Sequence, residues 1–248
     1  MKESTKIEIA RILNRCIEGA IGRVSKGETY RPFHEALLTK QLVIASTFER
    51  SFSTSFGQGP IEEISRLVAV DTGAECVRQK ETYVDVTKSA VDEIDRILSS
   101  LRSGDASPNW KKELAKIKAL AKGDHVQRRV ISDLWIKQGD SEIYISIKTV
   151  KPNLDQAEIA KKDMLLLKAH NSNCQTYLGL YYNPGGPQRK QYNWTIPSKI
   201  FDMINDTCVL IGQEYWDFIG GAGAYGDLLE IFAEVGEKTR DQLVRLGH

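Results

Sequence analysis

The chain has 248 residues, of which 41% are hydrophobic and 27% charged, and its formal net charge is +1. A chain of this length buries a sizeable core without disulfides, which excludes peptide hormones and disulfide-rich mini-domains. Its apolar runs fall far short of the roughly 20 residues that a membrane-spanning helix requires, and its N-terminal stretch is too polar for a secretory leader. We therefore expect a cytoplasmic protein without membrane insertion, whose four cysteines stay reduced.

Charge is distributed unevenly along the chain. Residues 108–151 contain ten lysines and arginines against five acids, and in residues 159–199 six bases accompany Asp163 alone. After Phe201 the balance reverses, with nine acids against three bases. A basic surface beside an acidic one is typical of a protein that holds nucleic acid in a groove. For the run over 108–122 alone, a solvated lysine-rich helix is the favoured explanation.

Apolar spacing predicts that the first half of the chain is mainly helical. Helices are expected over 4–22, ending at Gly22, over 32–48, from Pro60 onward, over 91–101 and over 110–120. The Ser/Thr/Gly-rich segment 51–59 is expected to form a loop. The pattern over 76–86 is ambiguous between helix and strand.

Beyond residue 122 the hydrophobic period changes from helical to alternating. Residues 129–136 and 142–149 flank the turn 138–141 and predict a β-hairpin. The elements expected after the hairpin are a helix over 155–169, strands over 176–182 and 208–211, and a helix over 225–235. This order predicts an α/β fold with a small mixed β-sheet flanked by helices.

We expect one domain in three parts. The parts are a helical N-terminal part over about 1–122, an α/β core over about 123–215 and a helical C-terminal part over about 216–248.

The register of the hairpin brings a carboxylate and an ammonium group together. We expect Lys137 and Glu142 to flank the turn as a pair. Asp133 then lies directly across from Ser146, and Lys148 shares the face of Ser146. Phosphodiester hydrolysis uses this combination, because a carboxylate binds a hard divalent cation and a nearby lysine orients or deprotonates the attacking water. The hairpin predicts a nuclease site, although an aspartate and a lysine also meet by chance on surface hairpins.

At these positions the chain resembles the PD-(D/E)XK nucleases, whose signature is an aspartate, a spacer and then Asp/Glu-X-Lys on the adjoining strand. Here Asp133 is followed by Ser146-Ile147-Lys148, so a neutral hydroxyl replaces the second acid. The resemblance implies that this acid comes from the next helix, where Glu158 is the candidate; a solvated helix glutamate is the alternative. It further implies a Mg²⁺ ion held by Asp133, Glu158 and the Ile147 carbonyl, with Lys148 positioning water.

Three longer segments, 48–58, 146–156 and 209–221, are similar to the TdeIII/MjaII-type family of type II restriction endonucleases. This resemblance implies a Mg²⁺-dependent homodimer that cuts both strands of double-stranded DNA at a short interrupted palindrome of the GGNCC kind. Two alternatives stay open. One is another PD-(D/E)XK nuclease, acting in repair or on junctions; the other is a non-catalytic DNA-binding protein that has lost the acid at Ser146.

A further acid is expected on the helix that starts at Pro60. The apolar stripe of that helix leaves Glu63 nearer to the buried edge than Glu62. The resemblance implies an acid at such a position, so Glu63 is expected as an auxiliary catalytic carboxylate. An exposed acid that interacts favourably with the helix dipole is the alternative.

Contacts with DNA are expected from three segments. Phosphates are expected to be bound from the Gly-flanked loop, by Arg50, Ser51, Ser53, Thr54 and Ser55. Guanine and cytosine edges in the major groove are read by basic, acidic and amide side chains, and the candidates are Lys151, Asn153, Asp155, Gln156, Arg189 and Lys190. A helix N-cap explains Asp155 without DNA.

Overall fold

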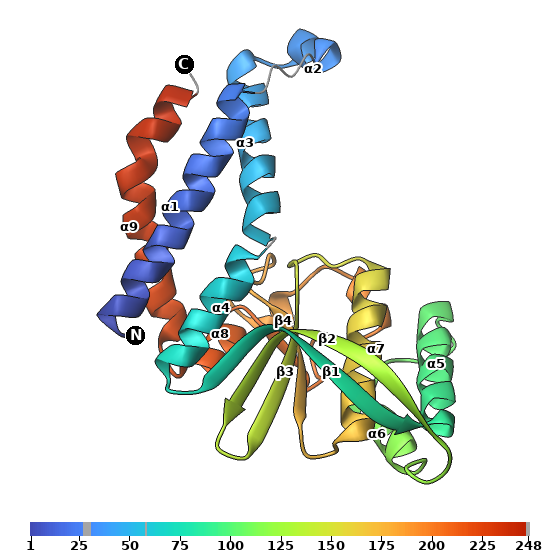
Figure 1. Cartoon of the computed structure of the whole chain (residues 1–248). Coiled ribbons are helices and arrows are strands. Elements are labelled where there is room, and N and C mark those ends of the chain that lie inside the picture. Colours follow the sequence, from blue (N-terminus) through green and yellow to red (C-terminus); the bar gives the residue numbers. More distant parts are fainter. Residues whose placement is uncertain (27–30, 58, 247–248) are drawn as a thin grey trace.

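A five-stranded mixed β-sheet forms the centre of the computed structural model, which describes residues 1–26, 31–57 and 59–246 (Figure 1). The strands are β1 (Glu75–Thr87), β2 (His125–Gln138), β3 (Ser141–Lys148), β4 (Gln175–Leu180) and β5 (Val209–Ile211), and they lie side by side in this order. The first three strands are antiparallel, and β4 and β5 run parallel to β3. The predicted α/β class with a small mixed sheet is confirmed.

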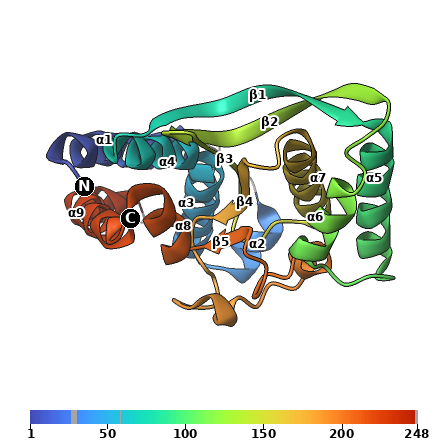
Figure 2. The ribbon, with the colours of Figure 1, turned by 90° about the horizontal axis from the view of Figure 1, so that it is seen from below.

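Helices cover both faces of this sheet. The helices among the described residues are α1 (Glu3–Lys26), α2 (Pro32–Leu37), α3 (Lys40–Gly57), α4 (Pro60–Asp71), α5 (Lys88–Ser103), α6 (Trp110–Lys118), α7 (Leu154–His170), α8 (Gln213–Gly220) and α9 (Ala224–Leu246). Figure 2 shows α5, α6 and α7 on one side of the molecule and α1, α4, α8 and α9 on the other. Short 3₁₀ helices at Arg189–Gln191 and Ile196–Lys199 lie between β4 and β5.

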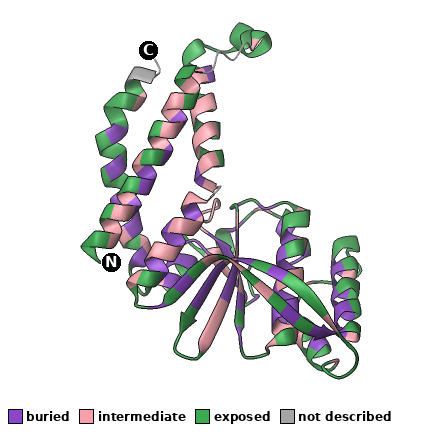
Figure 3. Ribbon diagram, viewed as in Figure 1, coloured by how far each residue is buried: buried purple, intermediate pink, exposed green. Residues whose placement is uncertain are grey.

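Two hydrophobic cores, one for each face, follow from the alternation of strand side chains. Tyr144 of β3 packs among the residues of α5, α6 and α7, whereas its neighbours Ile145 and Ile147 pack with α1, α4, α8 and α9. Figure 3 shows buried positions along the sheet and along the helix faces that meet it, while α2, at the tip of the arm formed by α1, α3 and α9, is exposed. None of the described helices combines the length and apolarity needed to cross a membrane.

The predicted hairpin has the expected register. Lys137 pairs with Glu142, and Leu134 pairs with Ile145. The segment whose pattern is ambiguous forms β1, which pairs with β2 from Glu75 to Thr87. The expected N-terminal part over about 1–122 is therefore not wholly helical, because its strand is specified by pairing with a distant segment and not by its own periodicity.

The largest corrections concern residues 32–59. The single helix expected over 32–48 is divided at Leu38, whose backbone is extended, into α2 and α3. The loop expected over 51–59 is helical as far as Gly57, and Gln58 lies outside the described residues. Phe48, Phe52 and Phe56 stack at intervals of four residues along α3, and this aromatic stripe overrides the Ser/Thr/Gly composition.

Two smaller corrections concern helix ends and a missed helix. Helix α1 continues through Gly22 to Lys26, and beyond Gly22 the side chain of Arg23 donates hydrogen bonds to Ser51 and Ser55 of α3. Helix α8 was not predicted, because its eight residues are too few for a clear periodic pattern.

Candidate active site

The hairpin brings Asp133 and Lys148 into direct contact. The Nζ atom of Lys148 lies 2.9 Å from Oδ2 of Asp133, and the two side chains are 20% and 18% exposed. The same ammonium group donates to the carbonyl oxygen of Ile147 at 3.2 Å. The expected juxtaposition of an acid and a lysine on neighbouring strands is therefore present in the structure.

The Asp133 carboxylate receives additional hydrogen bonds from β3. The backbone N–H of Ile147 donates to Oδ2 at 2.7 Å, and the Ser146 hydroxyl donates to the same oxygen at 3.4 Å. Ser146 thus contacts Asp133 as a donor and does not add a second carboxylate. These bonds hold Asp133 in one orientation at the end of the paired part of β3.

The other oxygen of Asp133 faces α4 through Gln79 of β1. The side-chain amide of Gln79 donates to Oδ1 of Asp133 at 3.3 Å and to Oε2 of Glu62 at 2.9 Å. Glu62 also lines a pocket of about 450 Å³ together with Ile147 and Lys148. The acid of α4 that joins the Asp133 site is therefore Glu62, one position before the expected Glu63.

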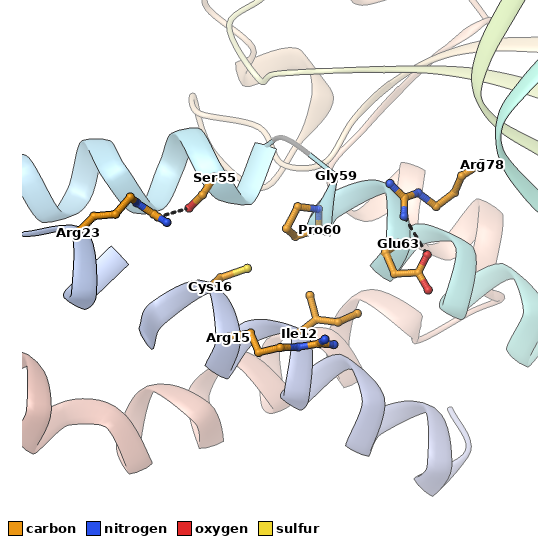
Figure 4. Close-up of a pocket in the computed structure, with 9 residues that line it drawn as sticks. All are labelled: Ile12, Arg15, Cys16, Arg23, Ser55, Gly59, Pro60, Glu63 and Arg78. Carbon is orange, nitrogen blue, oxygen red and sulfur yellow. Dashed lines mark hydrogen bonds and ion pairs between the residues drawn. The ribbon is translucent and has the colours of Figure 1, made fainter. Parts of the chain in front are cut away.

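Glu63 points into a different environment. It pairs with Arg66 at 2.6 Å and with Arg78 at 3.1 Å, and the hydrogen bond from Arg66, reinforced by Arg78, lowers the pKa of its carboxyl. Figure 4 shows Glu63 and Arg78 in a separate pocket of about 440 Å³ between α1 and the start of α4. The structure does not bring Glu63 to Asp133, because one residue along a helix turns the side chain by about 100°.

Of two acids of α7, Asp163 and not Glu158 is affected by the charges of the Asp133–Lys148 pair. Burial raises the pKa of Asp163 to about 6, and the charges of Lys148 and Asp133 both act on it. Glu158 instead pairs with Arg102 of α5 on the surface. The signal for Asp163 was present in the sequence, since it is the lone acid of a basic stretch.

The expected phosphate-binding residues do not lie together. Because α3 is helical, their side chains point to different sides of the helix. Ser53 and Thr54 line the pocket beside Lys148. Ser51 and Ser55 accept hydrogen bonds from Arg23 of α1, and Figure 4 shows the Arg23–Ser55 contact in the pocket near Cys16. Arg50 is exposed on the same helix.

Among the expected base-reading residues, Gln156 lies closest to the site. It lines the pocket that contains Lys148 and forms a capping box with Asn153, which is the N-cap of α7. Asp155 is therefore not the N-cap, and it pairs with Arg102 at 2.7 Å. Lys151 lies over the ring of Trp194, with Nζ 5.6 Å from the ring centroid.

The second expected base-reading segment has a structural residue and an exposed one. Arg189 pairs with Glu214 at 2.8 Å and donates to the carbonyl oxygens of Ile204 and Asp206, which anchors its loop. Lys190 is exposed. Arg189 is therefore held within the fold, and Lys190 is the residue of this pair that faces solvent.

The donor set at Asp133 fits a hard divalent cation. The described residues contain no group of three or more His, Cys, Asp or Glu side chains arranged to hold a metal ion. One carboxylate oxygen of Asp133 and the carbonyl oxygen of Ile147 nevertheless converge on a single ammonium nitrogen, at 2.9 and 3.2 Å. Oxygen atoms that share one cationic partner are the ligand type that Mg²⁺ accepts, with water completing its shell.

Comparisons with known proteins identify the family of the chain. A family model described as "Type II restriction endonuclease, HinfI" matches residues 1–236. The chain is 29% identical over 237 residues to the type II restriction enzyme HgiCII of Herpetosiphon aurantiacus, covering 92% of this chain and 86% of that protein. It is 30% identical over 221 residues to HgiBI of the same organism, covering 86% of this chain and 80% of the relative.

A more distant relative is MjaII, one of the two proteins after which the expected family is named. The chain is 26% identical over 202 residues to this type II restriction enzyme of Methanocaldococcus jannaschii, covering 73% of the chain and 52% of MjaII. No solved structure matches the chain.

Proposed function

The chain belongs to the HinfI family of type II restriction endonucleases, which are site-specific deoxyribonucleases, and we propose that it hydrolyses both strands of double-stranded DNA with Mg²⁺. The observation that carries the proposal is the contact of Lys148 with Asp133 and with the Ile147 carbonyl in a pocket of about 450 Å³. The proposed target is a short interrupted palindrome of the GGNCC kind.

The residues of the hairpin have different roles in the proposed reaction. Asp133 and the Ile147 carbonyl would hold the metal ion, which when bound acidifies a water molecule and offsets charge on the phosphate. Lys148 donates hydrogen bonds from the same side and orients the water that attacks phosphorus. Attack by water in line with the P–O3′ bond would break that bond and leave a 5′-phosphate and a 3′-hydroxyl, whose oxygen takes its proton from water.

The second acid of the site is proposed to be Asp163. Ser146 has no charge to offer, and Glu158 is engaged by Arg102. Asp163 lies where the charges of both Lys148 and Asp133 affect its pKa. A carboxylate at this position supplies the negative charge that the Ser-X-Lys sequence lacks.

DNA is proposed to enter over the pocket that contains Lys148. Ser53, Thr54 and Gln156 line this pocket and offer donors to phosphate oxygens or bases. Arg50 and Lys190, which are exposed, are proposed to add phosphate contacts. A two-fold symmetric target is cut on both strands by two copies of one chain, so we propose a homodimer.

Digestion of a plasmid of known sequence tests the proposal. With Mg²⁺, we expect discrete fragments whose mapped ends share one short interrupted palindrome, and no cutting in a chelator. Asp133→Asn protein purified in parallel controls for contaminating nuclease. Smeared or structure-dependent cleavage would instead indicate a repair or junction-resolving enzyme, and Mg²⁺-independent DNA binding without cleavage would indicate a non-catalytic protein.

A further inference from the structure

Gln79 has an unusual backbone conformation at the position opposite Asp133. Its φ angle is +51°, and it is the one non-glycine residue with positive φ among residues 1–26, 31–57 and 59–246. Its neighbours Arg78 and Lys80 pair with Leu134 and Ser132, which places Gln79 across from Asp133. A left-handed conformation is costly for an L-residue, and such residues occur preferentially at functional sites.

The side chain of Gln79 joins two acids that come from different elements. Its amide nitrogen lies 2.9 Å from Oε2 of Glu62 on α4 and 3.3 Å from Oδ1 of Asp133 on β2. A primary amide has two N–H groups, so it can donate one to each carboxylate. Without such a donor, two carboxylates that approach each other would repel.

Each oxygen of Asp133 therefore has a different partner. Oδ2 accepts from Lys148 and from the Ile147 N–H, while Oδ1 accepts from Gln79. Glu62 has a competing partner in Arg78, whose guanidinium lies 3.3 Å from Oε2 and also binds Glu63. Gln79 donates to the same Oε2 atom as Arg78, at the shorter distance, and among the described residues it is the hydrogen-bond link between Glu62 and Asp133.

We propose that Gln79 is a positioning residue, whose left-handed backbone and side-chain amide hold the Glu62 carboxylate beside Asp133 so that both acids act on the same divalent cation. This inference rests on the proposed function in assuming a metal-dependent site. It assigns the auxiliary acid of α4 to Glu62, and it explains why a non-glycine residue tolerates this conformation.

Metal binding by the free protein tests the proposal without DNA. Gln79→Gly keeps the left-handed backbone and removes the amide, and Gln127→Gly makes the same substitution on an exposed part of β2. In calorimetric titrations with Mn²⁺, we expect Gln79→Gly to weaken binding by about 10–100-fold and Gln127→Gly to leave it unchanged. The Mg²⁺ concentration for half-maximal cleavage should rise by a similar factor.

A double variant tests whether Gln79 affects Mn²⁺ binding through Glu62. Because Gln79 acts through Glu62, Gln79→Gly combined with Glu62→Gln should bind Mn²⁺ no more weakly than Glu62→Gln alone. Gln79→Asn, whose side chain tolerates the left-handed region but is one methylene shorter, provides a second variant if the glycine protein does not fold. It should weaken Mn²⁺ binding in the same way.

Three results would overturn the inference. The first is unchanged Mn²⁺ binding in both Gln79 variants, and the second is no Mn²⁺ binding by the unsubstituted protein. The third is a double variant whose loss of Mn²⁺ affinity equals the product of the losses in Gln79→Gly and Glu62→Gln. The outcome is separable from that of the proposed function. Coupling between Gln79 and Glu62 in Mn²⁺ binding, together with a failure to cut DNA, would retain the positioning role and reject the nuclease.

Discussion

Two lysine–carboxylate ion pairs with similar N–O distances have different roles in this molecule. Lys148 and Asp133 lie 2.9 Å apart, are 20% and 18% exposed and line or adjoin a pocket. Lys161 of α7 and Glu113 of α6 lie 2.7 Å apart, with side chains 0% and 7% exposed. Lys161 also donates to the carbonyl oxygen of Ile200, so its charge is enclosed by the fold.

The difference shows that the surroundings of an ion pair, and not its N–O distance, indicate its role. A buried pair such as Lys161–Glu113 holds helices together and has no access to a substrate. The half-buried pair at Asp133 is accessible from a pocket and has additional acids nearby. Lys161 must consequently be removed from the basic stretch that was expected to attract DNA.

The largest expected effect is on cleavage by the accessible pair. Asp133→Asn and Lys148→Ala should each lower the cleavage rate by about 10²–10⁴-fold, because each removes a group that acts directly on the reacting phosphate or water. Thermal unfolding should show that both proteins remain folded. Full cleavage by Lys148→Ala would reject the hairpin as the active site.

The enclosed pair should show the opposite behaviour, a large loss of stability. Lys161→Met leaves the buried Glu113 carboxylate without its cationic partner and should lower the free energy of unfolding by about 3–5 kcal/mol, measured by urea denaturation. Adding Glu113→Leu should recover most of this loss, and cleavage per folded molecule should remain unchanged. A stable Lys161→Met protein would show that the pair is not structural.

A smaller effect is expected from Asp163 when the pH is changed. Because the pKa is raised from 3.8 to about 6, the folded protein retains a proton that the unfolded chain releases between these values. Stability should therefore fall as the pH rises from about 4 to 6, by at most about 3 kcal/mol. Urea denaturation in a chelator measures this change, and Asp163→Asn should reduce its slope. An unchanged slope would contradict the burial of Asp163.

The smallest effect is expected at Glu158. Its partner Arg102 is exposed and also pairs with Asp155, and exposed ion pairs contribute little. Glu158→Gln should change the cleavage rate by less than about fivefold, in an assay run beside Asp163→Asn, whose rate should be clearly lower. If Glu158→Gln proved inactive and Asp163→Asn active, the second acid would be Glu158.

Local patterns predicted the hairpin because they depend on few residues. A turn at 138–141 and strict alternation on either side determine which residues face one another, so Asp133, Ser146 and Lys148 were assigned correctly to one another. The loop predicted over residues 51–59 is wrong because Phe56 of α3 packs against Tyr181 and Phe232, which lie far along the chain.

The amino-acid sequence by itself determined the class of fold, the hairpin and the pairing of an aspartate with a lysine, since a period of two and a short turn act within one segment. Tertiary structure alone decided that Gln79 links Glu62 to Asp133 and that the charges of the pair act on Asp163, because these contacts depend on how β1 pairs with β2 and how α4 and α7 pack against the sheet. A change of one position along a helix turns a side chain by about 100°, and sequence periodicity does not resolve such a rotation.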